Sequence, residues 1–103
     1  IFLEELNKIV YDNLQDPDFN LDSMAQLLNM SRSSLNRKIR GILDMTPNDY
    51  IRVERLKKAA VLLKDKSYKI NEVCYAVGFS TPSYFAKCFQ KQFGVLPKDF
   101  VEM

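Results

Sequence analysis

The chain has 103 residues, of which 47% are apolar, and its formal net charge is +2. This is the size of one small domain, and no run of about 18 uncharged apolar residues is present that could cross a membrane. Histidine is absent, and so are a Gly-rich phosphate loop and a paired-carboxylate motif, so we expect neither an enzyme nor a bound cofactor or metal.

The start of the chain and its cysteines indicate a cellular context. Position 1 is Ile rather than Met, and the following residues lack a signal-peptide pattern. We therefore expect a domain taken from a longer protein and a cytoplasmic location. Cys74 and Cys88 lack metal-ligand spacing and lie in apolar helical patterns. We expect two reduced, buried thiols rather than a disulfide or a redox switch.

The charge is unevenly distributed along the chain. Residues 1–30 contain one base and six acids, a net charge of −5, whereas residues 31–103 contain 14 bases and seven acids, a net charge of +7. A basic region on a small domain is typical of a nucleic-acid-binding protein. The alternative is an ordinary solvated basic surface, which charge alone does not exclude.

Apolar residues recur at helical spacing throughout, and no segment alternates as a strand does, so the predicted fold class is all-α. A first helix is expected over residues 2–14. Asn20 is suited to cap a second helix over residues 21–28, and Ser31 is suited to cap a third over residues 31–43.

A long fourth helix has a strong start signal. Thr46 is suited to be the cap, Pro47 fills the first turn, and Asp49 lies near the positive end of the helix dipole. The pattern continues through Leu63. Three further helices are expected over 70–77, over 81–93 and from Pro97 onward.

The chain also contains an internal repeat. Residues 21–31 match residues 70–80, and the match resumes after one extra residue at the start of the second copy. Asn29 corresponds to Gly78, and these residue types best tolerate the left-handed conformation that ends a helix before a sharp turn. Ser31 and Ser80 follow as expected caps. The repeat favours two helix-turn-helix units over plain helical hairpins.

The exposed faces of the two helices that follow these turns carry hydrogen-bond donors. With Leu35 and Ile39 turned to the core, the third helix exposes side chains suited to base edges and phosphates, and Arg37 could bind guanine in bidentate fashion. The exposed residues of the first copy are Ser33, Asn36, Arg37, Arg40 and Gly41. Those of the second copy are Ser83, Ala86, Lys87, Gln90 and Lys91.

Other basic and aromatic residues receive structural interpretations. The basic segment from Arg52 to Lys58 is interpreted mainly as solvated surface, with Arg55 in a structural ion pair. The aromatic residues at core spacings are expected to be buried rather than to stack on bases. They are Tyr50, Tyr68, Phe79, Phe85, Phe89 and Phe93.

Two segments resemble the AraC/XylS-type transcription activators. YIRVERLKKAAVLLKD resembles that family's linker helix, and INEVCYAVGFSTPSYFAKCFQKQFGVLPKDF resembles the signature of its second unit. The resemblance implies a seven-helix domain with two homeodomain-like helix-turn-helix units joined by a rigid helix. It predicts one domain over residues 1–103. Its parts are the first unit (1–45), the linker helix (46–66) and the second unit (67–103).

The resemblance also implies a DNA-binding site. The family's base readers occupy the positions of Ser33, Asn36, Arg37 and Arg40, and of Thr81, Pro82, Ser83 and Lys87. We expect the flanking basic residues Arg32 and Lys91 to contact phosphates.

Three residues depart from the family pattern. Asp44 replaces the usual Gly, so the turn after residues 31–43 is expected to differ. Cys74 replaces a small Ala. Pro82 replaces a polar reader, which predicts fewer base contacts from the second unit.

The resemblance extends to the output domains of hybrid two-component regulators. It implies a double-stranded DNA partner, activation by contact with RNA polymerase, and a full-length protein that dimerises through regions outside this segment. Such a full-length protein could be anchored in the membrane, although no membrane contact is expected from this segment. The alternative function is a protein-interaction module that binds an acidic partner.

Overall fold

The computed structural model describes all 103 residues, as seven helices without strands. The predicted all-α, seven-helix fold is therefore confirmed. The helices are α1 (Phe2–Asn13), α2 (Leu21–Leu27), α3 (Arg32–Leu43), α4 (Pro47–Lys64), α5 (Ile70–Ala76), α6 (Pro82–Phe93) and α7 (Pro97–Val101). None of them is long and apolar enough to cross a membrane.

Side-chain caps start three of the helices as predicted. The side-chain oxygens of Asn20, Ser31 and Thr46 each accept a hydrogen bond from a backbone N–H three residues later, at 3.0, 3.1 and 3.0 Å. The predicted cap Ser80 is wrong, because Thr81 is the residue that precedes α6 and it makes no side-chain cap bond. The extra residue of the second copy moves the helix start by one position. Pro82 then fills the first turn, where an N–H would lack a helical partner.

Left-handed residues end the helices of both copies. Asn29 and Gly78 have φ of 54° and 94°, as the repeat predicted. Asp44 and Gly94 follow α3 and α6 with φ of 54° and 82°. The expectation that Asp44 changes the turn is wrong, because Asp is among the residues that tolerate this conformation.

The molecule has two separate hydrophobic cores. The first joins α1, α2 and α3 to the start of α4, and the second joins the rest of α4 to α5 and α6. Tyr50 and Ile51 of α4 belong to the first core, whereas Leu56, Ala59 and Leu63 belong to the second. At about 100° per residue these two sets lie about 160° apart around the helix. α4 therefore buries opposite faces in the two units.

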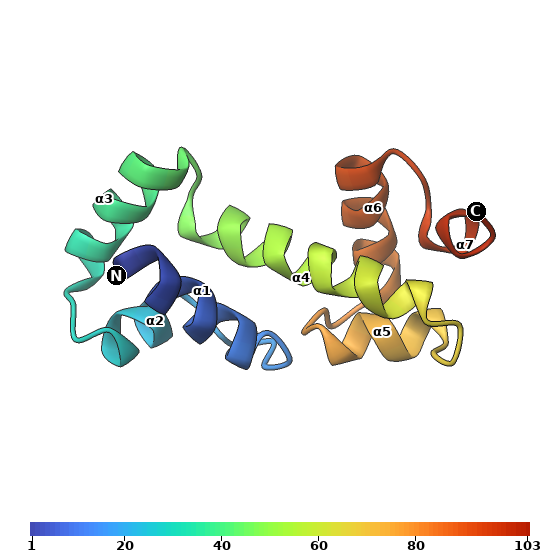
Figure 1. Cartoon of the computed structure of the whole chain (residues 1–103), viewed down its shortest axis with the longest axis horizontal. Helices are drawn as coiled ribbons and strands as arrows, with labels where there is room; N and C mark the ends of the chain where they lie inside the picture. Colours follow the sequence, from blue (N-terminus) through green and yellow to red (C-terminus); the bar gives the residue numbers. More distant parts are fainter.

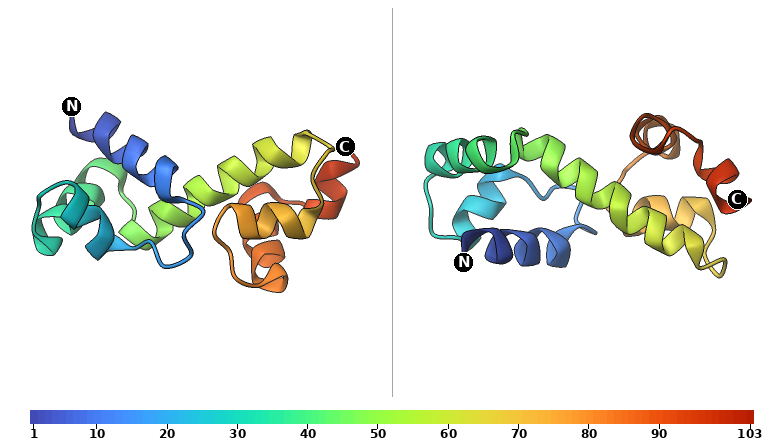
Figure 2. Two further views of the ribbon diagram at one scale, coloured as in Figure 1. Left: turned by 90° about the horizontal axis from the view of Figure 1, so that it is seen from below. Right: turned by 45° about the horizontal axis from the view of Figure 1, so that its top comes forward.

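The two units give the molecule an elongated shape, 42 × 23 × 22 Å. In Figure 1 α4 runs between the units, α3 and α6 lie above its axis at opposite ends, and α1, α2 and α5 lie below it. Figure 2 shows the same separation of the units from two further directions. The two candidate recognition helices are thus held apart on one side of the molecule.

Four of the six aromatic residues predicted to be buried lie in the cores: Tyr50, Phe79, Phe85 and Phe89. The other two predictions are wrong, because Tyr68 is 47% and Phe93 37% exposed. Tyr68 lies in the turn between α4 and α5, outside any packed helix face. Phe93 ends α6, and its ring packs on Phe89 at the edge of the core, with centroids 4.7 Å apart.

The two cysteines are free thiols. Cys74 is fully buried in the second core, which raises the pKa of its thiol through desolvation. Cys88 is only partly buried, so the expectation of two buried thiols holds for Cys74 alone.

Candidate nucleic-acid interface

The outermost face of α3 carries polar side chains with no partner inside the protein. Ser33 and Arg37 lie opposite the buried pair Leu35 and Ile39, since they are two residues before and after Leu35 on a helix of 3.6 residues per turn. Both are exposed, and neither takes part in a hydrogen bond or ion pair of its side chain. All the donors of the Arg37 guanidinium are therefore free for an external ligand.

A second stripe of α3 lines a groove against the starts of α2 and α4. Arg32, Asn36 and Arg40 are spaced four residues apart and lie in this groove. Arg40 donates from Nε to Oδ1 of Asn36 at 3.0 Å, and Arg32 forms an ion pair with Asp22 at 3.5 Å. The ion pair is exposed on both sides and so contributes little to stability. The protein thus orients the guanidinium groups of Arg32 and Arg40, and both groups can still bind an anion.

α6 presents the matching face of the second unit. Ser83, Lys87 and Lys91 are exposed, as is Thr81 before the helix, and neither lysine forms an ion pair. Lys87 and Lys91 line a groove shared with α4. The internal repeat equates this face with that of Ser33 and Arg37, so α3 and α6 each expose a serine and a basic side chain at matched positions.

The groove that is lined by arginines in the first unit has an apolar counterpart in the second unit. Pro82 and Ala86 of α6 occupy the positions of Arg32 and Asn36 and lie against the starts of α5 and α7. Pro82 is partly buried there and has no side-chain donor. The two units therefore share a backbone design but differ in the chemistry that they present.

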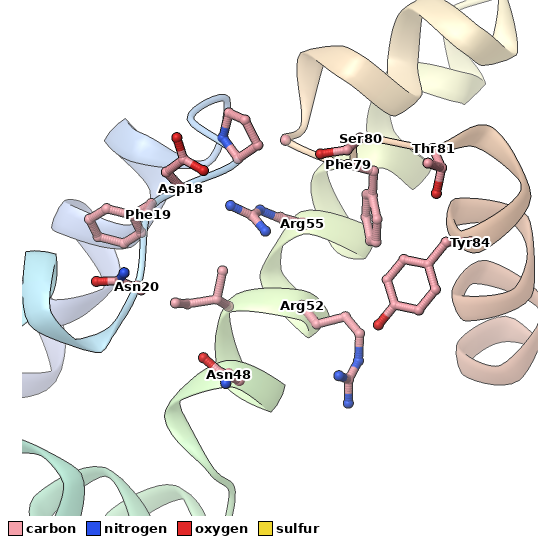
Figure 3. Close-up of a pocket in the computed structure, with 13 residues that line it drawn as sticks. Asp18, Phe19, Asn20, Asn48, Arg52, Arg55, Phe79, Ser80, Thr81 and Tyr84 are labelled. Carbon is pink, nitrogen blue, oxygen red and sulfur yellow. The ribbon is translucent and has the colours of Figure 1, made fainter.

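A cleft of about 590 Å³ lies between the two units on one face of α4 (Figure 3). Asn48 and Arg52, four residues apart, line it from α4, and Tyr84 lines it from α6. Asn48 also borders the groove of Arg32, and Arg52 borders the groove of Lys87. The three hollows therefore adjoin one another from α3 to α6. The first two are mainly polar, whereas polar and apolar residues contribute equally to the groove of Lys87.

Arg52 was interpreted as solvated surface, and its place between the helices was missed. Its side chain is 39% exposed, and its guanidinium pairs with the carboxylate of Asp49. Hydrogen bonds from Arg52 and from Thr46 hold the pKa of Asp49 below its usual value. The four-residue spacing of Asn48 and Arg52 could have indicated that they share a face.

Arg55 makes a structural contact, but the predicted ion pair is wrong. It donates from Nε to the carbonyl of Leu14 at 3.3 Å and from a terminal nitrogen to the carbonyl of Asp16 at 2.8 Å. Burial lowers the pKa of its guanidinium. Leu14 is the C-cap of α1, where backbone acceptors lack helical partners and attract cations. Asp16 lies in the turn that follows, and its carbonyl also accepts from the backbone N–H of Phe19 at 3.1 Å.

Comparison with known proteins identifies the family. Residues 24–103 match the family described as "Helix-turn-helix domain", which covers most of the chain. The chain belongs to the AraC/XylS-type helix-turn-helix family.

The AraC-type domain is similar to parts of longer regulators. It is 41% identical over 98 residues to histidine kinase P4 of Formosa agariphila. This alignment covers 95% of this chain and 7% of that protein. The domain spans about a third or less of the length of other curated transcription regulators that it matches.

Solved structures of the family have the same fold. The C-terminal domain of the response regulator AraT from Geobacillus stearothermophilus aligns with a TM-score of 0.87 and 29% identity, over 96% of this chain and 82% of that chain. The DNA-binding domain of AdpA in complex with a target DNA aligns with a TM-score of 0.87 and 25% identity, over 97% and 89%. The AraC-type domain accordingly belongs to a family of DNA-binding transcription regulators.

Proposed function

We propose that α3 and α6 bind adjacent major-groove segments on one face of double-stranded DNA. Successive major-groove segments on one face are about 34 Å apart. The domain is 42 Å long, with α3 at one end and α6 just inward of α7 at the other, so its length accommodates one helical turn between the two helices and is too short for two. This match of length to the helical repeat is the observation that carries the proposal.

Base reading is assigned to the outermost residues of the two helices. Arg37, free of internal partners, reads guanine in bidentate fashion, and Lys87 occupies the matching position in α6. Ser33 and Ser83 accept or donate to neighbouring bases. The remaining expected site residues are assigned to positioning and to phosphate contact: Arg32, Asn36, Arg40, Thr81, Pro82 and Lys91.

The bound site should be asymmetric. The first unit offers Arg32 and Arg40 beside its outermost face, whereas the second has Pro82 and Ala86 along the equivalent groove. The first unit therefore makes more charge-assisted contacts than the second. The base-reading residue also differs, Arg37 in α3 and Lys87 in α6, so the two halves of the bound site should differ. The predicted division into units 1–45 and 67–103, joined by residues 46–66, underlies this assignment.

Arg52 and Asn48 are proposed to contact the phosphates between the two major-groove segments. They lie on α4 between α3 and α6, in the mainly polar cleft that joins the grooves. A phosphate would replace Asp49 as the partner of the Arg52 guanidinium, which is partly exposed. These contacts would hold the domain in register without reading sequence.

The domain is proposed to be the output end of a two-component regulator that activates transcription. Support comes from its similarity to a segment of histidine kinase P4 and to the C-terminal domain of the response regulator AraT. A receiver or a dimerising region would then control DNA binding from outside this segment. RNA polymerase is the proposed partner in activation.

The proposal is tested by selecting binding sites from random DNA with this domain and then titrating the best site with salt. We expect an asymmetric motif of two blocks about ten base pairs apart, bound with a steep salt dependence. One enriched block would mean that a single unit reads sequence, which contradicts the two-reader mechanism. Weak, uniform binding without enrichment would favour the protein-interaction module.

A further inference from the structure

The two units meet through a small polar contact beside α4. Arg55 of α4 donates to the carbonyls of Leu14 and Asp16 in the first unit, at 3.3 and 2.8 Å. The same guanidinium packs against Gly78, in the turn between α5 and α6 of the second unit. Figure 3 shows Arg55 in the cleft between the segments of the two units. We call Leu14, Asp16, Arg55 and Gly78 the inter-unit contact.

Gly78 is packed too closely for any side chain. A Cβ at this position would lie 2.8 Å from Nε and 3.0 Å from Cζ of Arg55, and far inside van der Waals contact with the carbonyl oxygen of Leu14. That oxygen belongs to the backbone and has no rotamer through which to move away. A side chain at position 78 would therefore push the two units apart.

The first copy of the repeat shows that the turn itself does not demand glycine. Asn29 is the counterpart of Gly78, has φ of 54°, and is exposed to solvent. Asn29 therefore adopts the left-handed conformation while carrying a side chain. The distinguishing requirement at position 78 is the approach of Leu14 and Arg55 from outside the second unit.

Core packing does not support α4 where it passes from one unit to the other. The two cores share no residue, and the segment of α4 between Ile51 and Leu56 belongs to neither. One turn of α4 thus joins the units without core packing around it. Long helices are rarely straight, so a contact beside this turn restrains the orientation of the units.

We infer that the inter-unit contact fixes the orientation of α3 relative to α6 and thereby sets the spacing between the two DNA blocks that the domain accepts. This inference rests on the proposed two-reader function. Two readers held rigidly at the correct separation bind without the entropic cost of ordering them. One added base pair moves the second block by about 3.4 Å and rotates it by about 35°, which a rigid pair does not follow.

The contact is tested first without DNA. Residual dipolar couplings of the backbone amides report whether the units share one orientation. In the wild-type domain, couplings from residues 1–45 and 67–103 should fit a single alignment tensor. Gly78→Asn keeps a residue type that tolerates positive φ and adds the clash, so we expect the two units to require different tensors. Gly94→Asn is the matched control, because Gly94 has φ of 82° and open space around it.

A second variant guards against a folding defect in the turn. Arg55→Met keeps the apolar stem and removes every donor, so the carbonyl of Leu14 loses its partner and that of Asp16 keeps only the backbone N–H of Phe19. We expect the same divergence of alignment tensors, with each unit retaining its own pattern of couplings. A single shared tensor in both Gly78→Asn and Arg55→Met would overturn the inference, whatever the domain does with DNA.

The consequence for specificity is tested on the selected site with one base pair inserted or removed between its blocks. The wild-type domain should lose about tenfold or more in affinity, comparable to a mismatched base pair. Both variants should lose affinity for the original spacing and discriminate less among spacings, whereas Gly94→Asn should behave as wild type. Divergent tensors with an unchanged spacing preference would overturn the role in DNA recognition. Absence of any selected site would instead count against the proposed function.

Discussion

Arg40 donates from Nε to Oδ1 of Asn36 at 3.0 Å, so two side chains expected to bind DNA bind each other first. Asn36 is partly buried, whereas Arg40 is exposed. An arginine has five N–H donors, and this bond uses one of them. Asn36 thus orients a guanidinium whose other donors remain free.

A double-mutant cycle tests this relationship. Because Asn36 acts through Arg40, the effects of Asn36→Ala and Arg40→Ala on DNA affinity should not add, with a coupling energy of about 0.5–3 kcal/mol. The control cycle pairs Asn36→Ala with Lys87→Ala, whose residues lie in different units and should be additive within about 0.5 kcal/mol. Additivity in the first cycle would show that Asn36 binds DNA independently.

Arg37 and Lys91 should separate base reading from phosphate binding. Arg37→Ala should cost about 1–3 kcal/mol on the selected site and relax specificity at one position, because a bidentate guanine contact is lost. Lys91→Ala should weaken selected and random DNA alike. Binding curves on both DNAs provide the measurement. Equal losses on both DNAs for Arg37→Ala would refute the base-reading assignment.

Arg52 should contribute one phosphate contact and no sequence information. Arg52→Gln is expected to weaken all sequences equally and to lower the slope of log K against log salt by about 0.9. Lys57→Gln removes the same charge from α4 but at a position paired with Glu54, away from the cleft. An unchanged slope in Arg52→Gln, or an equal change in Lys57→Gln, would argue against a specific phosphate contact.

Much of this fold follows from local chemistry that the sequence displays. The cap Thr46, the left-handed Asn29 and Gly78, and the buried pair Phe85 and Phe89 depend on neighbours within a few residues or on helical spacing. Such features depend little on the rest of the molecule. The repeat supports the turn residues and the buried pair further, because each has a counterpart in the other copy, whereas the cap Thr46 corresponds to Leu96, which makes no cap bond.

The contacts between units did not follow from the sequence. The acceptors of Arg55 are backbone carbonyls 41 and 39 residues away, and every residue has a carbonyl. An arginine on a helix indicates an acidic partner more readily than a helix end. The position of Arg52 was not predicted for the same reason, since it depends on how α4 turns opposite faces to the two cores.

The caps of α4 and α6 should differ in their contribution to stability. Thr46→Ala should cost about 1 kcal/mol, because its hydroxyl accepts the hydrogen bond of the Asp49 N–H. Thr81→Ala is the natural comparison, since Thr81 makes no side-chain cap bond and should change the free energy of unfolding far less. Urea denaturation of the three proteins measures the difference. Equal destabilisation by the two substitutions would contradict the assigned caps.

Asp49 should link stability to pH and to DNA binding with opposite signs. Its pKa is depressed in the folded domain by hydrogen bonds from Arg52 and then Thr46. A depressed pKa stabilises the fold above the unfolded value, about 3.9, and this stabilisation disappears as pH falls through the folded value. Asp49→Asn should therefore be less stable than wild type at pH 7, and the difference should shrink below about pH 4. The effect is small, because the side chain of Asp49 is 42% exposed.

The same substitution should strengthen DNA binding at pH 7. Without the carboxylate, Arg52 gains freedom to pair with a phosphate, and one repulsive charge is removed from the interface. Urea unfolding between pH 3 and 7, together with affinity for random DNA at pH 7, measures both effects on one protein. For the DNA-binding measurement at pH 7, Thr46→Ala serves as the control, since it destabilises α4 while leaving the negative charge of Asp49 in place. Weaker DNA binding in Asp49→Asn would mean that the ion pair positions Arg52 for phosphate rather than competing with it.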